Sequence, residues 1–214
     1  MNSHPPGHSG TNGHRLRILG VDPAVAGATG YGIVEIEGAC TRMLRFGALK
    51  LPARATFAAR LRGIHQLIAG LVEEFAPDAV AVEAVFTALN ARTALKLAEM
   101  RGVVLLAAAQ AQIPAHSYSP REVKASVAGY GAASKQQMQQ MVKSLLGLAQ
   151  HPEPADAADA LAVALCHGYL SQARERIAAA TTKRNDPNPA RSASHETRTV
   201  PGSRKPGARI VESR

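Results

Sequence analysis

Short apolar runs separated by turn residues occupy the first part of the chain. Leu16–Val21, Tyr31–Glu37 and Thr41–Leu49 each have the length and the apolar character of a strand. A loop at Asp22–Gly30 separates the first two runs, and Gly38 marks a turn before the third. Strands spaced this closely form antiparallel hairpins. The pattern therefore predicts three antiparallel strands at the start of the domain.

From Ala55 onwards the apolar residues recur every three or four positions, which is the period of an amphipathic helix. The stripe of the first helix consists of Phe57, Leu61, Ile64, Leu67, Leu71 and Phe75, and the helix ends near Pro77. Further helices are expected at Leu89–Gln112, from Pro120, at Ser134–Leu148 and from Ala155 to about Arg176, with short strands at Ala79–Val82 and Ala115–Tyr118. This order predicts an α/β fold in which helices flank a five-stranded mixed sheet.

The two ends of the chain differ in composition from the part between them. Residues 1–14 are polar and rich in Gly, His and Ser, and residues 181–214 contain few large apolar residues. Segments of this kind cannot build a packed core, so we expect a disordered leader, one domain at residues 15–180 and a disordered tail. The tail is basic: it contains eight Lys or Arg residues and three Asp or Glu residues, in a chain of formal net charge +9.

No segment resembles a membrane span or a signal peptide. The most apolar stretch, Val103–Ala111, has about half of the roughly 20 residues that a span requires. The leader lacks the apolar core of a signal peptide. We therefore expect a soluble, cytoplasmic protein.

Four acidic residues lie where apolar runs end or where a helix begins. Asp22 and Glu83 each close a predicted strand, and Asp156 and Asp159 are three residues apart at the start of the last helix, on one face. Each has an ordinary explanation taken alone: Asp156 could complement the helix dipole, Asp22 could cap a turn, and Glu83 could face solvent. Asp159 precedes an apolar stretch that would bury its face. The four together indicate a site rather than four coincidences.

Carboxylates are the ligands that proteins offer to magnesium, with water and substrate phosphate in the remaining positions. Two such ions about 4 Å apart can hold the attacking and leaving oxygens of an in-line displacement. A basic chain with an acidic site also suggests a polyanionic substrate, because Lys and Arg hold phosphates around a metal-neutralised centre. The residues therefore indicate phosphodiester hydrolysis on nucleic acid.

The chain resembles the RuvC family of Holliday-junction resolvases, which have the ribonuclease H-like fold. The resemblance extends from about Ile18 to His167. It consists of five blocks in order: ILGVDP at 18–23, TGYG at 29–32, VEAVFTALNARTALKLAEMRG at 82–102, REVKASVAGYGAASK at 121–135 and DAADALAVALCH at 156–167. One departure lies after Asp22, where Ala24 replaces a Gly of the family pattern and the loop is one residue longer.

By this resemblance, Asp22, Glu83, Asp156 and Asp159 are the four catalytic metal ligands, and two magnesium ions are expected, with manganese as a substitute. Lys124 and Lys135 match basic residues that hold DNA phosphates, although an ordinary solvated helix face would also explain them. Phe86 matches an aromatic residue that meets DNA bases near the crossover. The helix at 89–112 matches the helix through which the family forms homodimers. RuvA and RuvB, the branch-migration proteins, are the implied protein partners.

The resulting hypothesis is a magnesium-dependent homodimer that resolves four-way DNA junctions by paired symmetric nicks in recombination and repair. The first alternative is another nuclease of the same fold, acting on other branched DNA or on structured RNA. An ATP-binding phosphotransferase could use a similar loop around Asp22, but it would need a second comparable domain. A catalytically silent DNA-binding protein is disfavoured by four intact acids.

Overall fold

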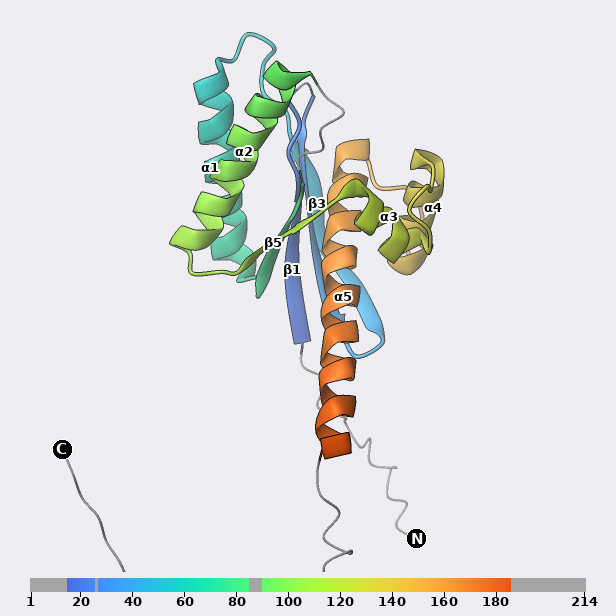
Figure 1. Ribbon diagram of the computed structural model, residues 1–214. Coiled ribbons are helices and arrows are strands. Elements are labelled where there is room, and N and C mark those ends of the chain that lie inside the picture. Colours follow the sequence, from blue (N-terminus) through green and yellow to red (C-terminus); the bar gives the residue numbers. More distant parts are fainter. Residues whose placement is uncertain (1–14, 26, 85–89, 186–214) are drawn as a thin grey trace, which may run out of the picture. The chain divides into compact units, whose positions relative to one another are not determined.

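The computed structural model describes residues 15–25, 27–84 and 90–185. It contains a five-stranded sheet with helices on both faces (Figure 1). Its elements, in chain order, are β1 Arg15–Asp22, β2 Thr29–Glu37, β3 Cys40–Leu49, α1 Phe57–Phe75, β4 Ala79–Glu83, α2 Ala91–Gln110, β5 Ala115–Tyr118, α3 Pro120–Ala128, α4 Lys135–Leu145 and α5 Ala155–Asn185. None of the helices in these described ranges is both long enough and apolar enough to cross a membrane.

The strand order in the sheet is β3-β2-β1-β4-β5. The first three strands pair antiparallel, whereas β4 runs parallel to both β1 and β5. The predicted mixed sheet is therefore confirmed. Strand β2 begins at Thr29, two residues earlier than predicted, because Gly30 already pairs with Asp22.

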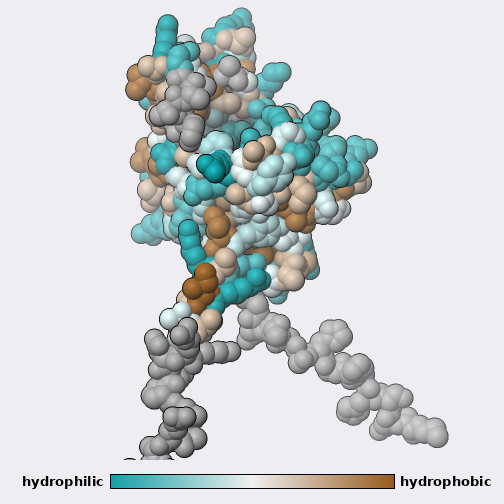
Figure 2. All heavy atoms as spheres, turned by 45° about the vertical axis from the view of Figure 1, so that its right-hand side comes forward, coloured by the Kyte–Doolittle hydropathy of each residue, from teal (hydrophilic) through white to brown (hydrophobic). Residues whose placement is uncertain are grey.

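Helices α1 and α2 cover one face of the sheet, and α5 covers the other together with α3 and α4 (Figure 1). Side chains alternate between the faces along each strand. In β1, Leu19 and Val21 pack towards α1 and α2, whereas Ile18 packs towards α5. All three side chains are fully buried. The outer surface over α3 and α4 is mainly hydrophilic (Figure 2).

Helix starts follow recognisable side-chain caps. Ser119 caps α3 and exchanges hydrogen bonds with Glu122, and Pro120 occupies the first turn as predicted. Ser134 caps α4 in the same way with Gln137. These reciprocal caps provide hydrogen-bond acceptors for backbone N–H groups that the first turn of a helix leaves unpaired. The cap at Ser134 also fixes the end of the short turn that joins α3 to α4.

Two predicted helix ends are wrong. Helix α4 ends at Leu145 rather than Leu148, where the backbone turns at Gly147 with φ 61°. Helix α5 continues to Asn185, beyond the predicted end near Arg176 and into the segment predicted to be a disordered tail. Residues 177–214 form a separate unit, of which 177–185 are described as helix. The leader at 1–14 and residues 186–214 lie outside the described part of the chain.

Candidate functional site

The candidate site lies at the carboxyl ends of two neighbouring parallel strands. Val21 of β1 pairs with Val82 of β4, and each is followed directly by an acid, Asp22 or Glu83. Because side chains alternate along a strand, both acids point to the face of the sheet that α5 covers. The two side chains are close enough for each to affect the pKa of the other.

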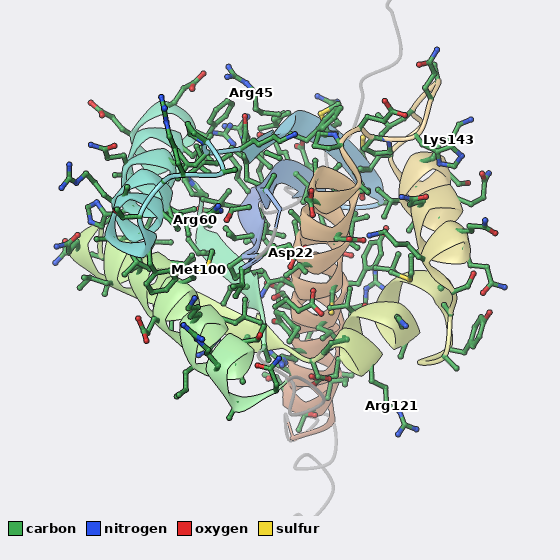
Figure 3. All side chains as sticks on the ribbon, turned by 90° about the horizontal axis from the view of Figure 1, so that it is seen from above. Asp22, Arg45, Arg60, Met100, Arg121 and Lys143 are labelled. Atoms are coloured by element: carbon green, nitrogen blue, oxygen red, sulfur yellow. The ribbon has the colours of Figure 1, made fainter. Side chains whose placement is uncertain are left out.

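Helix α5 brings the other two acids to the same place, because its first turns lie directly on glycines of the sheet. A Cβ atom built on Gly30 would lie 1.9 Å from the carbonyl oxygen of Asp156. A Cβ on Gly20 would lie 2.1 Å from the carbonyl oxygen of Ala160. Only glycine permits so close an approach. Figure 3, which looks down on the sheet from above Figure 1, places Asp22 beside α5.

The four acids repel one another strongly. Burial, followed by the charges of Glu83, Asp159 and Asp156, raises the pKa of Asp22 to about 8. Burial and the charge of Asp159 also raise the pKa of Glu83. A cluster of like charges this close is unfavourable unless protons or cations neutralise it.

Two lysines supply part of the compensating charge. Lys135 is the first residue of α4, and its Nζ atom lies 2.9 Å from Oδ2 of Asp159. This contact raises the pKa of Lys135, and Lys124 of α3 acts with Lys135 to lower the pKa of Glu83. Two of the acids and both lysines meet at a pocket of about 230 Å³, which is lined by Glu83, Pro120, Val123, Lys124, Lys135, Met138, Asp159 and Ala162.

The donor set fits a hard divalent cation that is shared with a substrate. Within residues 15–25, 27–84 and 90–185, no three His, Cys, Asp or Glu side chains converge closely enough to enclose a metal ion by themselves. Magnesium seldom requires such a cage, since water and substrate phosphate usually complete its six oxygen ligands. Such an ion needs hard oxygen ligands and nearby negative charge, and this group of carboxylates supplies both.

The structure places most of the predicted site residues in one region of the molecule. The structure brings Asp22, Glu83, Asp156 and Asp159 together and places Lys124 and Lys135 beside them. Phe86 lies in 85–89, outside the described residues. In the longer loop after Asp22, Val25 packs against the core formed with α1 and α2, and Ala26 is not described.

The supporting glycines were not predicted. The signal for them was present in the sequence, because glycine is unusual inside a buried strand and often marks a close backbone approach. Gly20 and Gly32 are directly paired across β1 and β2. Together with Gly30 they leave a bare strip on the sheet, and α5 lies on it.

Comparison with known proteins gives consistent results. The family model described as crossover junction endodeoxyribonuclease RuvC matches residues 18–167. A protein of Chloroflexus aurantiacus with that name is 47% identical over 162 residues, which cover 76% of this chain and 98% of the relative. Among solved structures, Thermus thermophilus RuvC has a TM-score of 0.68 at 34% identity. T. thermophilus RuvC in complex with Holliday junction substrate has a TM-score of 0.67 at 33% identity. Both alignments cover 73% of this chain and 96% of the other.

Proposed function

This chain belongs to the RuvC family of crossover junction endodeoxyribonucleases and is a Holliday-junction resolvase of ribonuclease H-like fold; we propose that its four-carboxylate site performs the cleavage. The observation that carries this proposal is the convergence of Asp22, Glu83, Asp156 and Asp159 from three elements of the chain. The process served is DNA recombination and repair.

Two magnesium ions are expected, and manganese would serve as a substitute. When bound, they would lower the pKa of a water molecule. They would also supply positive charge next to the scissile phosphate and the leaving 3′ oxygen. Asp22 and Glu83 would hold these ions from the strand ends. Asp156 and Asp159 would hold them from α5. Burial and the neighbouring negative charges raise the pKa of Asp22, and this supports the role, because a divalent cation would offset both effects.

The lysines beside the acids would position the DNA backbone. Lys135 neutralises Asp159 in the absence of a metal ion and would be free to bind a phosphate once a cation replaces it. Lys124 lines the same pocket and would bind a neighbouring phosphate. For Phe86 the proposed contact with bases near the crossover is supported by the family resemblance alone.

We propose that the protein acts as a homodimer through the outer face of α2. Leu95 and Leu106 on this helix are 65% and 52% exposed. They are eleven residues apart, close to three helical turns, so they share one face. Two large apolar side chains on one exposed helix face are typical of an interface. A symmetric dimer would present two sites for two symmetric nicks.

The expected cellular setting follows from the substrate. We expect the protein to act in the cytoplasm, where the DNA of bacterial relatives is found. We also expect RuvA and RuvB as partners, and this expectation is supported only by family membership.

The direct test is cleavage of a synthetic four-way junction with and without magnesium. The variants are Asp22→Asn, Glu83→Gln, Asp156→Asn and Asp159→Asn, and the matched control is Glu74→Gln, an exposed acid that pairs with Arg45. Each site variant should lose nearly all cleavage and still bind the junction, because it removes a metal-binding charge without changing size. The control should cleave like the wild type. Near-normal cleavage by three of the four variants would refute the shared site.

A substrate panel separates the main alternative. Linear duplex, three-way branched DNA and structured RNA should be cleaved far more slowly than the four-way junction. Equal cleavage of branched DNA or RNA would instead identify a nuclease of the same fold with a different substrate. Tight junction binding without any cleavage would identify a silent binding protein.

A further inference from the structure

A second pocket adjoins the catalytic one on the outer side of α3. It has a volume of about 200 Å³ and is lined by Pro120, Arg121, Lys124 and Gly131. Pro120 and Lys124 also line the pocket that contains Glu83 and Asp159. The two pockets therefore form a continuous surface that leads away from the carboxylates. Arg121 and Lys124 are three residues apart, so both cations lie on one face of α3.

Gly131, in the turn between α3 and α4, has no side chain, and this leaves room for Arg121 to pack against the turn. A Cβ atom built on Gly131 would lie 2.6 Å from Cγ of Arg121 and 3.2 Å from its Nε. The stem of Arg121 thus lies directly on the backbone of the turn. Within the described residues, Arg121 forms no ion pair with an acid. Its planar guanidinium is therefore available to an external anion.

Tyr130, which precedes Gly131, adds an exposed aromatic ring at the same turn. Its side chain is 47% exposed although it is a large apolar group. Its hydroxyl donates a hydrogen bond to Oε1 of Gln137, at 2.6 Å. The same oxygen accepts the backbone N–H of Ser134 at 2.8 Å, within the cap of α4. The ring is therefore tethered at its polar end, while its faces remain partly accessible to solvent.

From these observations we propose that Arg121 and Tyr130 form a DNA-contact surface beside the catalytic pocket. Arg121 binds a backbone phosphate of the strand that enters the site, and the Tyr130 ring packs on an unpaired nucleotide next to that phosphate. The proposal rests on the proposed function, because it takes junction DNA as the ligand. Cations combined with an exposed aromatic ring are the usual means of holding unpaired nucleic acid.

The surroundings favour nucleic acid over a protein partner. The surface over α3 and α4 is mainly hydrophilic (Figure 2), whereas a protein interface would have an apolar centre. The surface also continues directly into a pocket whose own substrate is a phosphodiester. A strand that reaches the acids across Lys124 passes Arg121 on the way.

The first experiment measures junction binding by the full chain at a series of salt concentrations, with EDTA present to prevent cleavage. Arg121→Gln should weaken binding several-fold and reduce the slope of log K against log salt by about 0.9, the value for one phosphate contact. Lys143→Gln is the matched control: this lysine is on α4, and Figure 3 shows it well away from Arg121. The control should leave both affinity and slope unchanged.

Gly131→Ala provides an independent variant that moves the charge instead of removing it. The added methyl group must displace the stem of Arg121, so affinity should fall as it does in Arg121→Gln. The double variant should be no weaker than either single variant, since both act through one contact. Full additivity of the two effects would overturn the link between Gly131 and Arg121.

Tyr130→Ala tests the ring, and Tyr130→Phe tests the tether alone. The alanine variant should bind the junction about ten-fold more weakly, with a much smaller effect on linear duplex, which offers no unpaired nucleotide. The phenylalanine variant keeps the ring and should lose less. Equal weakening on duplex and junction would overturn the contact with an unpaired nucleotide.

Cleavage kinetics separate this inference from the proposed function. Both Arg121→Gln and Tyr130→Ala should raise the junction concentration needed for half-maximal rate and leave the rate at saturation unchanged. If the wild type cleaves junctions and both variants bind normally with an unaltered salt slope, the inference fails and the proposed function stands. If the wild type does not cleave junctions, the proposed function fails first.

Discussion

Replacing Asp22 by asparagine should stabilise the protein when no divalent ion is present, even though it removes a proposed catalytic residue. Burial and the neighbouring charges of Glu83, Asp159 and Asp156 raise the pKa of Asp22 from 3.8 to about 8. The unfolded chain therefore ionises this group more easily than the folded chain does. At neutral pH, folding must either protonate Asp22 or bury its charge. Asparagine has the same shape and avoids both costs.

The magnitude follows from the pKa shift. Between pH 3.8 and pH 7 the folded carboxyl remains mostly protonated while the unfolded one is ionised, and each pH unit costs about 1.4 kcal/mol. The upper limit at pH 7 is therefore about 4 kcal/mol. Asp22 is half-buried, and solvent reduces the effect, so we expect a gain of about 1–3 kcal/mol. This gain corresponds to a rise in Tm of roughly 2–4 °C per kcal/mol.

The assay is thermal unfolding in EDTA from about pH 3 to about pH 9. The advantage of Asp22→Asn should be absent below pH 3.8, where both states are protonated, and should reach a plateau above about pH 8. Glu35→Gln is the opposite control, because a hydrogen bond from Arg17 lowers the pKa of Glu35, so its charge stabilises the fold. That variant should be less stable at pH 7, and the difference should disappear as the pH falls through the lowered pKa of Glu35.

Adding magnesium should reverse the order. A ligand that binds only the folded state stabilises it by RT ln(1 + [L]/Kd), so the Tm of the wild type should rise with magnesium concentration. The Tm of Asp22→Asn should hardly change. A variant that is less stable than the wild type in EDTA at pH 7 would refute the reasoning, because it would show that Asp22 stabilises the metal-free fold.

Three further predictions concern other parts of the chain. Lys135→Gln removes the cation that pairs with Asp159, so the Tm in EDTA should fall. Added magnesium should restore most of this loss, and an equal loss of Tm with and without magnesium would contradict the prediction. Leu106→Glu should give folded monomers in analytical ultracentrifugation, whereas a glutamate at fully buried Val104 should unfold the domain; a dimeric Leu106→Glu would exclude this face of α2. A chain that ends after Asn185 loses six Lys and Arg residues. It should bind junction and duplex DNA more weakly by similar factors, with a flatter salt dependence. A changed preference for junctions would contradict a purely electrostatic role of the tail.

The sequence was most informative where local chemistry decides the outcome. Short apolar runs predicted the strands, and an acid at the end of each of two strands predicted two of the four candidate ligands. Pro120 and Ser134 marked helix starts because proline and serine fit the first turn for reasons that need no tertiary contact. These features depend on residues that are adjacent in the chain.

Helix α2 shows where such reasoning stops. The run Val103–Ala109 is apolar on every side, so periodicity cannot say which side faces the sheet. In the structure Val104 and Ala108 are fully buried against the core, and Leu106, between them, is 52% exposed. The orientation depends on packing against α1 and the sheet. The pattern alone therefore predicted a buried or paired helix without identifying the face that is left for a partner.

The length of α5 was missed for a different reason. The composition after Ala180 cannot form a core, and by itself it predicts disorder. A helix needs only good propensity and no breaker, and the segment from Ala178 has alanines and no glycine or proline until Pro187. The helix is described as far as Asn185, and the side chains at 177–182 are exposed. Here local propensity decided the structure where burial could not.

The bare strip under α5 has a consequence for how this gene can vary. A methyl group at Gly30 would have to push the backbone of Asp156 away by more than an ångström, whereas metal–ligand distances tolerate about 0.2 Å. An error of about 1 Å in a catalytic group can reduce a rate by about a hundred-fold. One uncharged substitution at a residue other than the four acids should therefore produce a null allele of a folded protein. Selection should restrict Gly20 and Gly30 as tightly as the acids that they allow α5 to position.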